Sequence, residues 1–187
     1  GIEIRTIFRY NMHINEWTQE DNKAMIGIIG AMEEEVAALK EAMEVQETVE
    51  KASMVFCKGI LCGKEAVIVR SGIGKVNAGI CAQILVDRFG ADMLINTGIA
   101  GSLDAKIDIG DMVISTDALH HDMDATEFGY PVGQVPRMEV MSFPADEELV
   151  KKAVWASEKA NPDIHTFTGR VASGDQFIAS REVKDKI

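Results

Sequence analysis

Glu35, whose carboxylate lies on the apolar face of a predicted helix, is the residue best placed to do chemistry. The segment GIIGAMEEEV runs from a short apolar strand through a glycine into that helix. Residues three or four apart form its apolar stripe, namely Met32, Glu35, Val36, Leu39 and Met43. Glu33 and Glu34 lie off the stripe and complement the helix dipole, a role that Glu35 could share. Alternatively, Glu35 is a general base beside the strand ends, where open α/β sheets bind ligands.

Two glycine-rich turns also follow strands and could contact a ligand. In VIVRSGIGKVNAG the glycines Gly72, Gly74 and Gly79 do not have the GxGxxG spacing of a dinucleotide site. This turn either supplies only positive φ angles or forms a backbone surface on which a sugar could lie. The segment INTGIAGSL opens a strand into a loop of small residues, 97–102, which either reverses the chain or admits a flat base.

The histidines and one aromatic residue of the C-terminal half have competing explanations. His120 and His121 precede two aspartates, Asp122 and Asp124, but adjacent residues of a strand point to opposite faces. We therefore expect no metal site here. Phe177 follows a strand and the turn SGD, and is either a core aromatic residue or a stacking platform.

Composition excludes several classes of partner. The chain has 187 residues, 47% of them hydrophobic, and a net charge of -11 with no basic cluster, which disfavours nucleic acids and anionic membranes. Its three cysteines have no metal-ligand spacing, so free thiols in a reducing compartment are expected. With no apolar run of about 20 residues and no signal peptide, we expect a cytoplasmic protein.

Strands alternate with helices from Met25 onward. Residues 1–24 are polar and irregular, so we interpret them as an N-terminal extension or a cloning remnant, whereas the alternation of Ile2 and Ile4 would instead fit a short strand. The predicted strands are IGIIG, MVFCKGI, EAVIVR, DMLINTG, DMVIST and TFTGRVAS, and the predicted helices are 32–44, 76–89 and 145–160. This order predicts one compact α/β unit with a mostly parallel or mixed central sheet flanked by helices. Ser180 is a candidate N-cap of a last helix that looks cut short.

Five motifs together resemble the 5′-methylthioadenosine/S-adenosylhomocysteine nucleosidases: GIIGAMEEEV, SGIGKVNAG, NTGIAGSL, HHDMDATEFGYPVGQVP and SGDQFI. The resemblance runs from Met25 to Ile187. It implies a nucleoside phosphorylase-like domain over 25–187, a homodimer and no cofactor. It also implies hydrolysis of the N-glycosidic bond, with release of adenine and the thio-ribose, in methionine salvage and in the recycling of S-adenosylmethionine by-products.

The resemblance also assigns site residues. Glu35 is similar to the family's water-activating base. Residues expected to contact substrate are Ala31 and Met32 beside the ribose, Ile73 beside the sugar and the attacking water, and Gly101, Phe177 and Ile178 around adenine. Residues expected to enter the partner subunit's pocket are Ala125, Phe128 and Pro136.

In one respect the chain departs from the family. The family follows SGDxFI with a Met-Glu-rich strand that holds the ribose, and later with an aspartate that protonates adenine. Neither is found in these residues, so we expect a C-terminally truncated chain of low activity. The alternatives are a purine nucleoside phosphorylase, a non-catalytic nucleoside-binding or dimerisation module and, more distantly, a dinucleotide-binding oxidoreductase. The phosphorylase would have to bind phosphate, and the negative charges of Glu33, Glu34 and Glu35 nearby would repel that anion.

Overall fold

The computed structural model describes residues 24–187, which divide into two compact units, 24–100 and 101–187. The sequence predicted one compact unit, and the difference arises because the strands of the two units pair in separate sheets. The predicted N-terminal extension lies outside the described residues except for Ala24. Among the described residues, no helix is long and apolar enough to cross a membrane.

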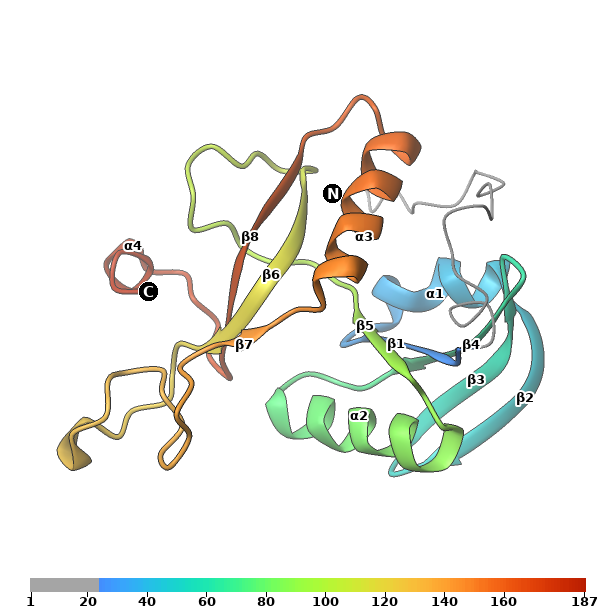
Figure 1. Ribbon diagram of the computed structural model, residues 1–187, viewed down its shortest axis with the longest axis horizontal. Helices are drawn as coiled ribbons and strands as arrows, with labels where there is room; N and C mark the ends of the chain where they lie inside the picture. The colour runs from blue at the N-terminus through green and yellow to red at the C-terminus, as the bar shows by residue number, and fades with distance from the viewer. Residues whose placement is uncertain (1–23) are drawn as a thin grey trace. The chain divides into compact units, whose positions relative to one another are not determined.

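The first unit is a five-stranded mixed sheet with a helix on each face (Figure 1). Its strands are β1 (Ile26–Gly30), β2 (Glu44–Lys51), β3 (Met54–Leu61), β4 (Lys64–Arg70) and β5 (Met93–Asn96), and its helices are α1 (Glu33–Ala42) and α2 (Lys75–Phe89). The strand order is β2-β3-β4-β1-β5. Strand β1 pairs in parallel with β4 and β5, whereas β2, β3 and β4 form antiparallel hairpins. This arrangement confirms the predicted fold class.

Alternation along the strands builds one apolar layer on each side of this sheet. Ile26 and Ile28 pack in the layer that contains Val36 of α1. Ile29 packs on the other face, in the layer that contains Leu85 of α2. Successive side chains of a strand point to opposite faces, so a continuous apolar run can serve both layers.

Strand β2 was not predicted. Its sequence EVQETVEK is polar, and nearly all of its side chains are exposed, because it lies at the edge of the sheet. An edge strand exposed on both faces lacks the apolar alternation that reveals other strands. It is joined to β3 by a two-residue turn in which Ala52 and Ser53 have φ angles of 50° and 60°. Positive values at both positions are those of the type I′ turn favoured in hairpins.

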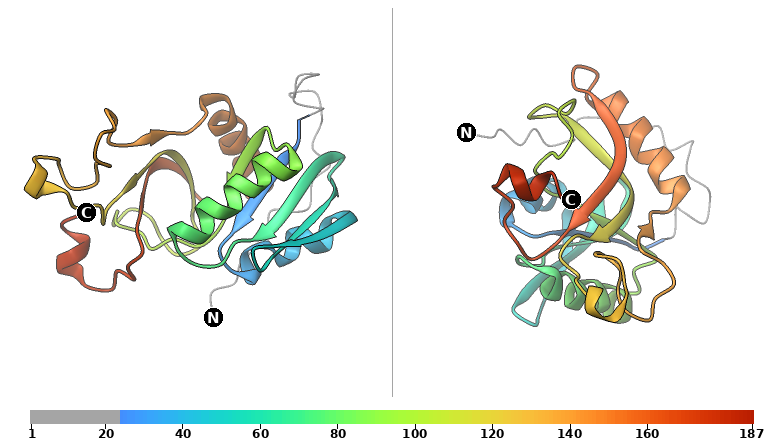
Figure 2. Two further views of the ribbon diagram at one scale, coloured as in Figure 1. Left: turned by 90° about the horizontal axis from the view of Figure 1, so that it is seen from below. Right: turned by 90° about the vertical axis from the view of Figure 1, so that its left-hand side faces the viewer.

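The second unit contains a three-stranded sheet, a long helix and two short helical turns (Figure 2). Its elements are β6 (Met112–His120), the 3-10 turn η2 (Thr126–Phe128), β7 (Phe143–Pro144), α3 (Glu147–Ala160), β8 (Thr166–Ser173) and α4 (Arg181–Lys184). Strand β6 is central, parallel to β8 and antiparallel to β7. Asp146 caps α3 by accepting a hydrogen bond from the Leu149 amide at 2.9 Å. Ser180 stands at the N-cap of α4 as predicted, but its side chain makes no capping hydrogen bond.

Candidate active site

Two backbone amides hold the carboxylate of Glu35. Its Oε2 accepts a hydrogen bond from the amide of Met32 at 2.9 Å, within the first turn of α1. Its Oε1 accepts one from the amide of Ile99 at 3.0 Å, in the loop that follows β5. The side chain is half-buried, which agrees with its place on the apolar stripe of the helix. A carboxylate has about four lone-pair sites, so two amide donors leave sites on both oxygens for another donor.

The C-terminal ends of β1, β4 and β5 lie side by side at this carboxylate. The parallel pairing continues past the strands, because the amide of Ser71 donates to the carbonyl oxygen of Gly30 at 2.8 Å. On the other side of β1, the amide of Thr97 donates to the carbonyl oxygen of Ile29 at 2.9 Å. The loops after the three strands therefore leave the sheet at one edge, where α/β proteins bind ligands.

The turn after β4 presents Ile73 to solvent, with its side chain 75% exposed. Gly72 and Gly74 have φ angles of 84° and 101°, which glycine adopts without a steric cost. The amide nitrogen of the Asn77 side chain donates to the carbonyl oxygen of Ile73 at 2.7 Å and fixes the turn on the first turn of α2. Ala31 and Met32, between β1 and α1, are half-buried.

A cation at the same edge is already paired with a glutamate. Arg70, the last residue of β4, lies with its Nε 3.7 Å from Oε2 of Glu33. Lys40 also contacts Glu33, at 2.8 Å. The positive charge of Arg70 is therefore directed toward a carboxylate, and both side chains are about half exposed.

In the second unit, the loop after β8 carries the residues expected at adenine. Phe177 is 97% exposed and Ile178 is half-buried, so the core explanation of Phe177 is wrong for this structure. The amide of Asp175 donates to Oδ2 of Asp122 at 2.7 Å. The ring of His121 fills the space where a side chain at position 174 would lie, which requires glycine there. Gly101, at the start of this unit, is exposed.

The two adjacent histidines contact different neighbours, as expected for residues at the end of a strand. His120 packs edge-on against Phe143, whereas His121 lies against Gly174. Within residues 24–187, no group of three or more histidines, cysteines or acidic residues could hold a metal ion. The cysteines are free, and burial raises the pKa of the Cys81 thiol to about 11.

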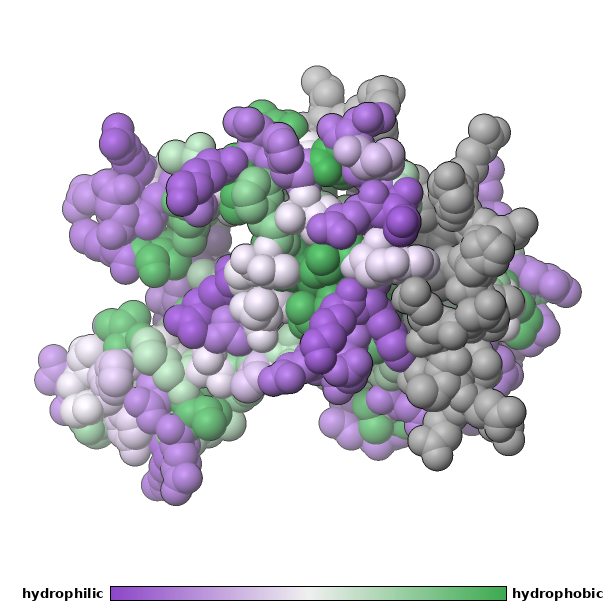
Figure 3. Space-filling view, turned by 45° about the horizontal axis from the view of Figure 1, so that its top comes forward, coloured by the Kyte–Doolittle hydropathy of each residue, from purple (hydrophilic) through white to green (hydrophobic). Residues whose placement is uncertain are grey.

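The segment expected to reach a partner subunit combines covered and exposed residues. Ala125 is buried, and its carbonyl oxygen accepts a hydrogen bond from the amide of Phe128 at 3.0 Å. The ring of Phe128 is 84% exposed, and Pro136 is half-buried. Hydrophobic residues reach the surface at several places in Figure 3, and Phe128 is among the most exposed.

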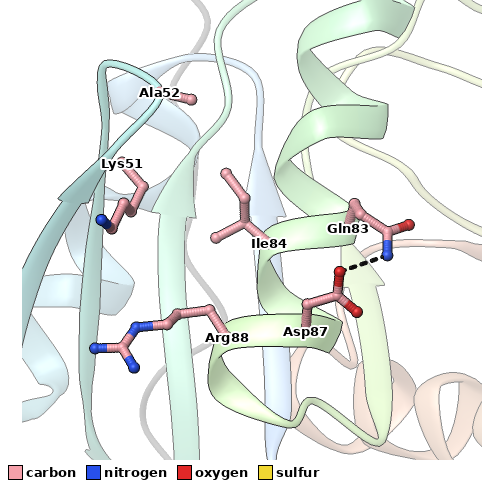
Figure 4. Close-up of a pocket in the computed structure, with 6 residues that line it drawn as sticks. All are labelled: Lys51, Ala52, Gln83, Ile84, Asp87 and Arg88. Atoms are coloured by element: carbon pink, nitrogen blue, oxygen red, sulfur yellow. Dashed lines mark hydrogen bonds between the residues drawn. The ribbon is translucent and has the colours of Figure 1, made fainter.

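A separate cavity of about 350 Å³ lies between the β2–β3 turn and the C-terminal half of α2 (Figure 4). Its lining residues are Lys51, Ala52, Gln83, Ile84, Asp87 and Arg88. The side-chain amide of Gln83 donates to Oδ2 of Asp87 at 2.8 Å along the helix. None of the lining residues belongs to the candidate active site.

Sequence reasoning singled out Glu35 but gave no signal for two other groups, one that holds this carboxylate and one that holds a loop of the second unit. The amide of Ile99 donates to the carboxylate, and Asp122 holds the loop that carries Phe177. The small residues of 97–102 marked the first loop as a place of close approach, but they did not show which amide would donate. No pattern connects Asp122 with Asp175, because the two are 53 residues apart.

Sequence comparison shows the relationship directly. The family model of the phosphorylase superfamily matches residues 25–187. A 5′-methylthioadenosine/S-adenosylhomocysteine nucleosidase of Staphylococcus haemolyticus is 46% identical over 156 residues, which cover 83% of this chain and 67% of the relative. The chain belongs to this nucleosidase family. A nucleosidase of the same name from Staphylococcus aureus is 45% identical over 163 residues, covering 87% of this chain and 70% of the relative.

Solved structures of nucleosidases have the same fold. The nucleosidase of Colwellia psychrerythraea, in complex with adenine, is 42% identical with a TM-score of 0.83, over 88% of this chain and 67% of that one. The nucleosidase of Neisseria meningitidis, in complex with methylthio-immucillin-A, is 38% identical with a TM-score of 0.82, over 87% of this chain and 69% of that one.

Proposed function

We propose that the protein hydrolyses the N-glycosidic bond of 5′-methylthioadenosine and S-adenosylhomocysteine, and that Glu35 is its general base. Two relatives more than 40% identical are nucleosidases for these two substrates, and related structures hold adenine or methylthio-immucillin-A. The observation that carries the base role is the half-buried carboxylate of Glu35, held by the amides of Met32 and Ile99 at the edge of the sheet.

The chemistry follows from this arrangement. The bond between the sugar carbon C1′ and adenine N9 breaks with its electron pair moving to the purine, which leaves an oxocarbenium-like sugar. A water oxygen bonds to C1′, and its proton passes to Glu35. Adenine must receive a proton as it leaves, and general acid or base help at each end is worth about 10²- to 10⁴-fold.

The other site residues divide between the two units. Ala31, Met32 and Ile73 follow β1 and β4 at the edge that carries Glu35, which supports their assignment to the ribose and the attacking water. Gly101, Phe177 and Ile178 belong to the second unit, and we assign them to adenine. The exposed ring of Phe177 supports this role, because its faces are available to stack on a base.

Phosphorolysis on the same fold is less favoured. A phosphate that replaced the attacking water would need cations near Glu35. Arg70 lies at the end of β4 but is paired with Glu33, and Glu33 and Glu34 add negative charge at the start of the same helix. Repulsion between like charges would weaken phosphate binding there.

The chain is shorter than the relatives that it matches. The match covers about two thirds of the relatives, 67% and 70% of their lengths. In the family, the acid that protonates adenine follows the segment similar to SGDQFI. Activity is therefore measured on an extended chain, which consists of this chain followed by the last third of the Staphylococcus haemolyticus relative, and we expect this extended chain to release adenine.

The test of the base role is Glu35→Gln in this extended chain. Glutamine keeps the size of the side chain but cannot accept the proton, so adenine release from methylthioadenosine should fall by about 10²-fold or more. Binding of a substrate analogue, measured by calorimetry, should be retained. The control is Glu34→Gln, which changes an exposed neighbour of the same charge. Unchanged turnover of the Glu35→Gln variant would exclude Glu35 as the base.

We also propose a cytoplasmic homodimer whose interface includes residues 125–136. The three free cysteines support a reducing compartment, and the exposed ring of Phe128 supports a contact with a second copy.

A further inference from the structure

Gly98 leaves the space that the carboxylate of Glu35 occupies. A Cβ atom at position 98 would lie 2.5 Å from Oε1 of Glu35, 2.8 Å from its Cδ and 3.1 Å from its Oε2. Carbon atoms pack at about 3.5 to 4.0 Å, so even a methyl group at this position would collide with the carboxylate. The three nearest atoms to this Cβ all belong to Glu35.

The same carboxylate is bounded on another side by a second glycine. A Cβ atom at Gly30, the last residue of β1, would lie 3.1 Å from Cβ of Glu35 and 3.5 Å from its Oε2. That atom would also lie 2.6 Å from Cγ1 of Val36, a fully buried core residue. A side chain at Gly30 would therefore disturb the core, whereas the three atoms nearest to a Cβ atom at Gly98 all belong to the end of the Glu35 side chain.

The backbone of Gly98 does not itself require glycine. Its φ angle lies outside the positive range, in contrast to those of Gly72 and Gly74. Alanine could therefore adopt the backbone conformation without strain. The closest collision of this Cβ atom is with the head of a flexible side chain, which can turn away.

We propose that Gly98 is a positioning residue that sets the place of the general base, an inference that rests on the proposed function of Glu35. Without a side chain at position 98, the carboxylate lies close enough to the loop for the amide of Ile99 to donate to Oε1. A methyl group there would push the carboxylate out of this position and break that hydrogen bond. Displacing a catalytic group by about 1 Å can cost about 10²-fold in rate.

The first test reads the hydrogen bond directly in the 187-residue chain. In ¹H–¹⁵N spectra of the wild type, the amide of Ile99 should be protected against exchange with solvent deuterium, and Glu35→Ala, which removes the acceptor, should abolish this protection. Gly98→Ala should abolish it too. Gly169→Ala is the control, because a Cβ atom there meets nothing within 4 Å and its φ is not positive. Unchanged protection of the Ile99 amide in Gly98→Ala would overturn the inference.

A second variant covers the case in which Gly98→Ala does not fold. Glu35→Ala removes the carboxylate, so Gly98→Ala should be tolerated in that background, and the double variant should give a folded spectrum. If the double variant also fails to fold, the collision is not with Glu35 and the inference is wrong.

Kinetics on the extended chain separate positioning from folding. Gly98→Ala should lower kcat about 10²-fold with KM unchanged, and it should have no further effect on a chain that already carries Glu35→Gln. If the losses in kcat caused by Gly98→Ala and by Glu35→Gln added up in the double variant, the two residues would act independently, which would contradict the inference. The spectra do not depend on turnover. If the Glu35→Gln chain were fully active, Glu35 would not be the base, but the spectra would still test whether Gly98 sets the position of its carboxylate.

Discussion

A carboxylate that takes a proton from water must be held in place and still keep lone pairs free. Glu35 meets both requirements, because each oxygen accepts one backbone amide, from Met32 or from Ile99. The helical spacing of the sequence was enough to separate Glu35 from Glu33 and Glu34. It could not show the amide of Ile99, which is 64 residues away and approaches only when β5 pairs with β1.

A second carboxylate, Asp117 of β6, gives a prediction about stability and pH. The guanidinium of Arg170, in β8, donates from Nε to both oxygens of Asp117, at 3.0 and 3.1 Å, and from Nη2 to Oδ2 at 2.6 Å. The hydrogen bonds from Arg170, and then one from Ser142, lower the pKa of Asp117. A carboxyl group whose pKa is lower in the folded protein stabilises it above the ordinary aspartate pKa of about 4, and this contribution is lost as the pH falls through the lower value.

The free energy of unfolding of the wild type should therefore fall as the pH drops below about 4. Asp117→Asn should remove part of this dependence and reduce stability at neutral pH. Urea unfolding between pH 7 and pH 3 measures both, with Asp163→Asn in an exposed turn as the control. If the free energy of unfolding depended on pH equally in the Asp117→Asn variant and the wild type, the pair of Asp117 and Arg170 would contribute nothing to stability.

At the scale of elements, the alternation of apolar and polar residues predicted most strands and helices, including β8, which has no fully buried residue. Strands β1, β3, β4 and β8 and the helices α1, α2 and α3 lie within a few residues of their predicted bounds. Strand β2 is exposed, and β7 has two residues, so neither has a pattern to detect. Strand β6 extends four residues beyond the predicted run, to His120, because its pairing with β8 continues through residues 117–120.

Packing of β3 against α2 should account for much of the first unit's stability. Phe56 of β3 is fully buried and stacks on Phe89, the last residue of α2, with ring centroids 5.2 Å apart. Phe56→Ala should lower the free energy of unfolding by about 3 to 5 kcal/mol. Val55→Ala, at an exposed neighbour, is the control and should cost about 0.5 kcal/mol or less. If urea unfolding gave a similar, small loss in the free energy of unfolding for both variants, the packing of Phe56 would not be an important part of the core.

For the whole molecule, the relationship to nucleosidases was predictable because five separate motifs occur in order. The division into two units was not, because strand patterns do not show which strands will share a sheet. Nor does a sequence show whether an aromatic residue such as Phe177 lies in a core or on a surface. Its place after a strand and a turn fits both, and only the structure shows the ring exposed.

The proposed homodimer gives a prediction for the whole molecule. If residues 125–136 form the dimer interface, Phe128→Asp should shift the protein toward monomer in sedimentation velocity at micromolar concentration. Ile109→Asp is the matched control, because Ile109 is 93% exposed and lies outside that segment. A wild-type monomer, or equal weakening by both variants, would contradict the proposed interface.

The central claim is that this chain belongs to an enzyme that adds water across an N-glycosidic bond. The most direct measurement is mass spectrometry of the sugar formed from methylthioadenosine by the extended chain in H₂¹⁸O, with and without phosphate. We predict adenine and a thio-ribose carrying one ¹⁸O atom at C1′, formed at the same rate in both buffers. A sugar 1-phosphate, or adenine release that requires phosphate, would contradict the account.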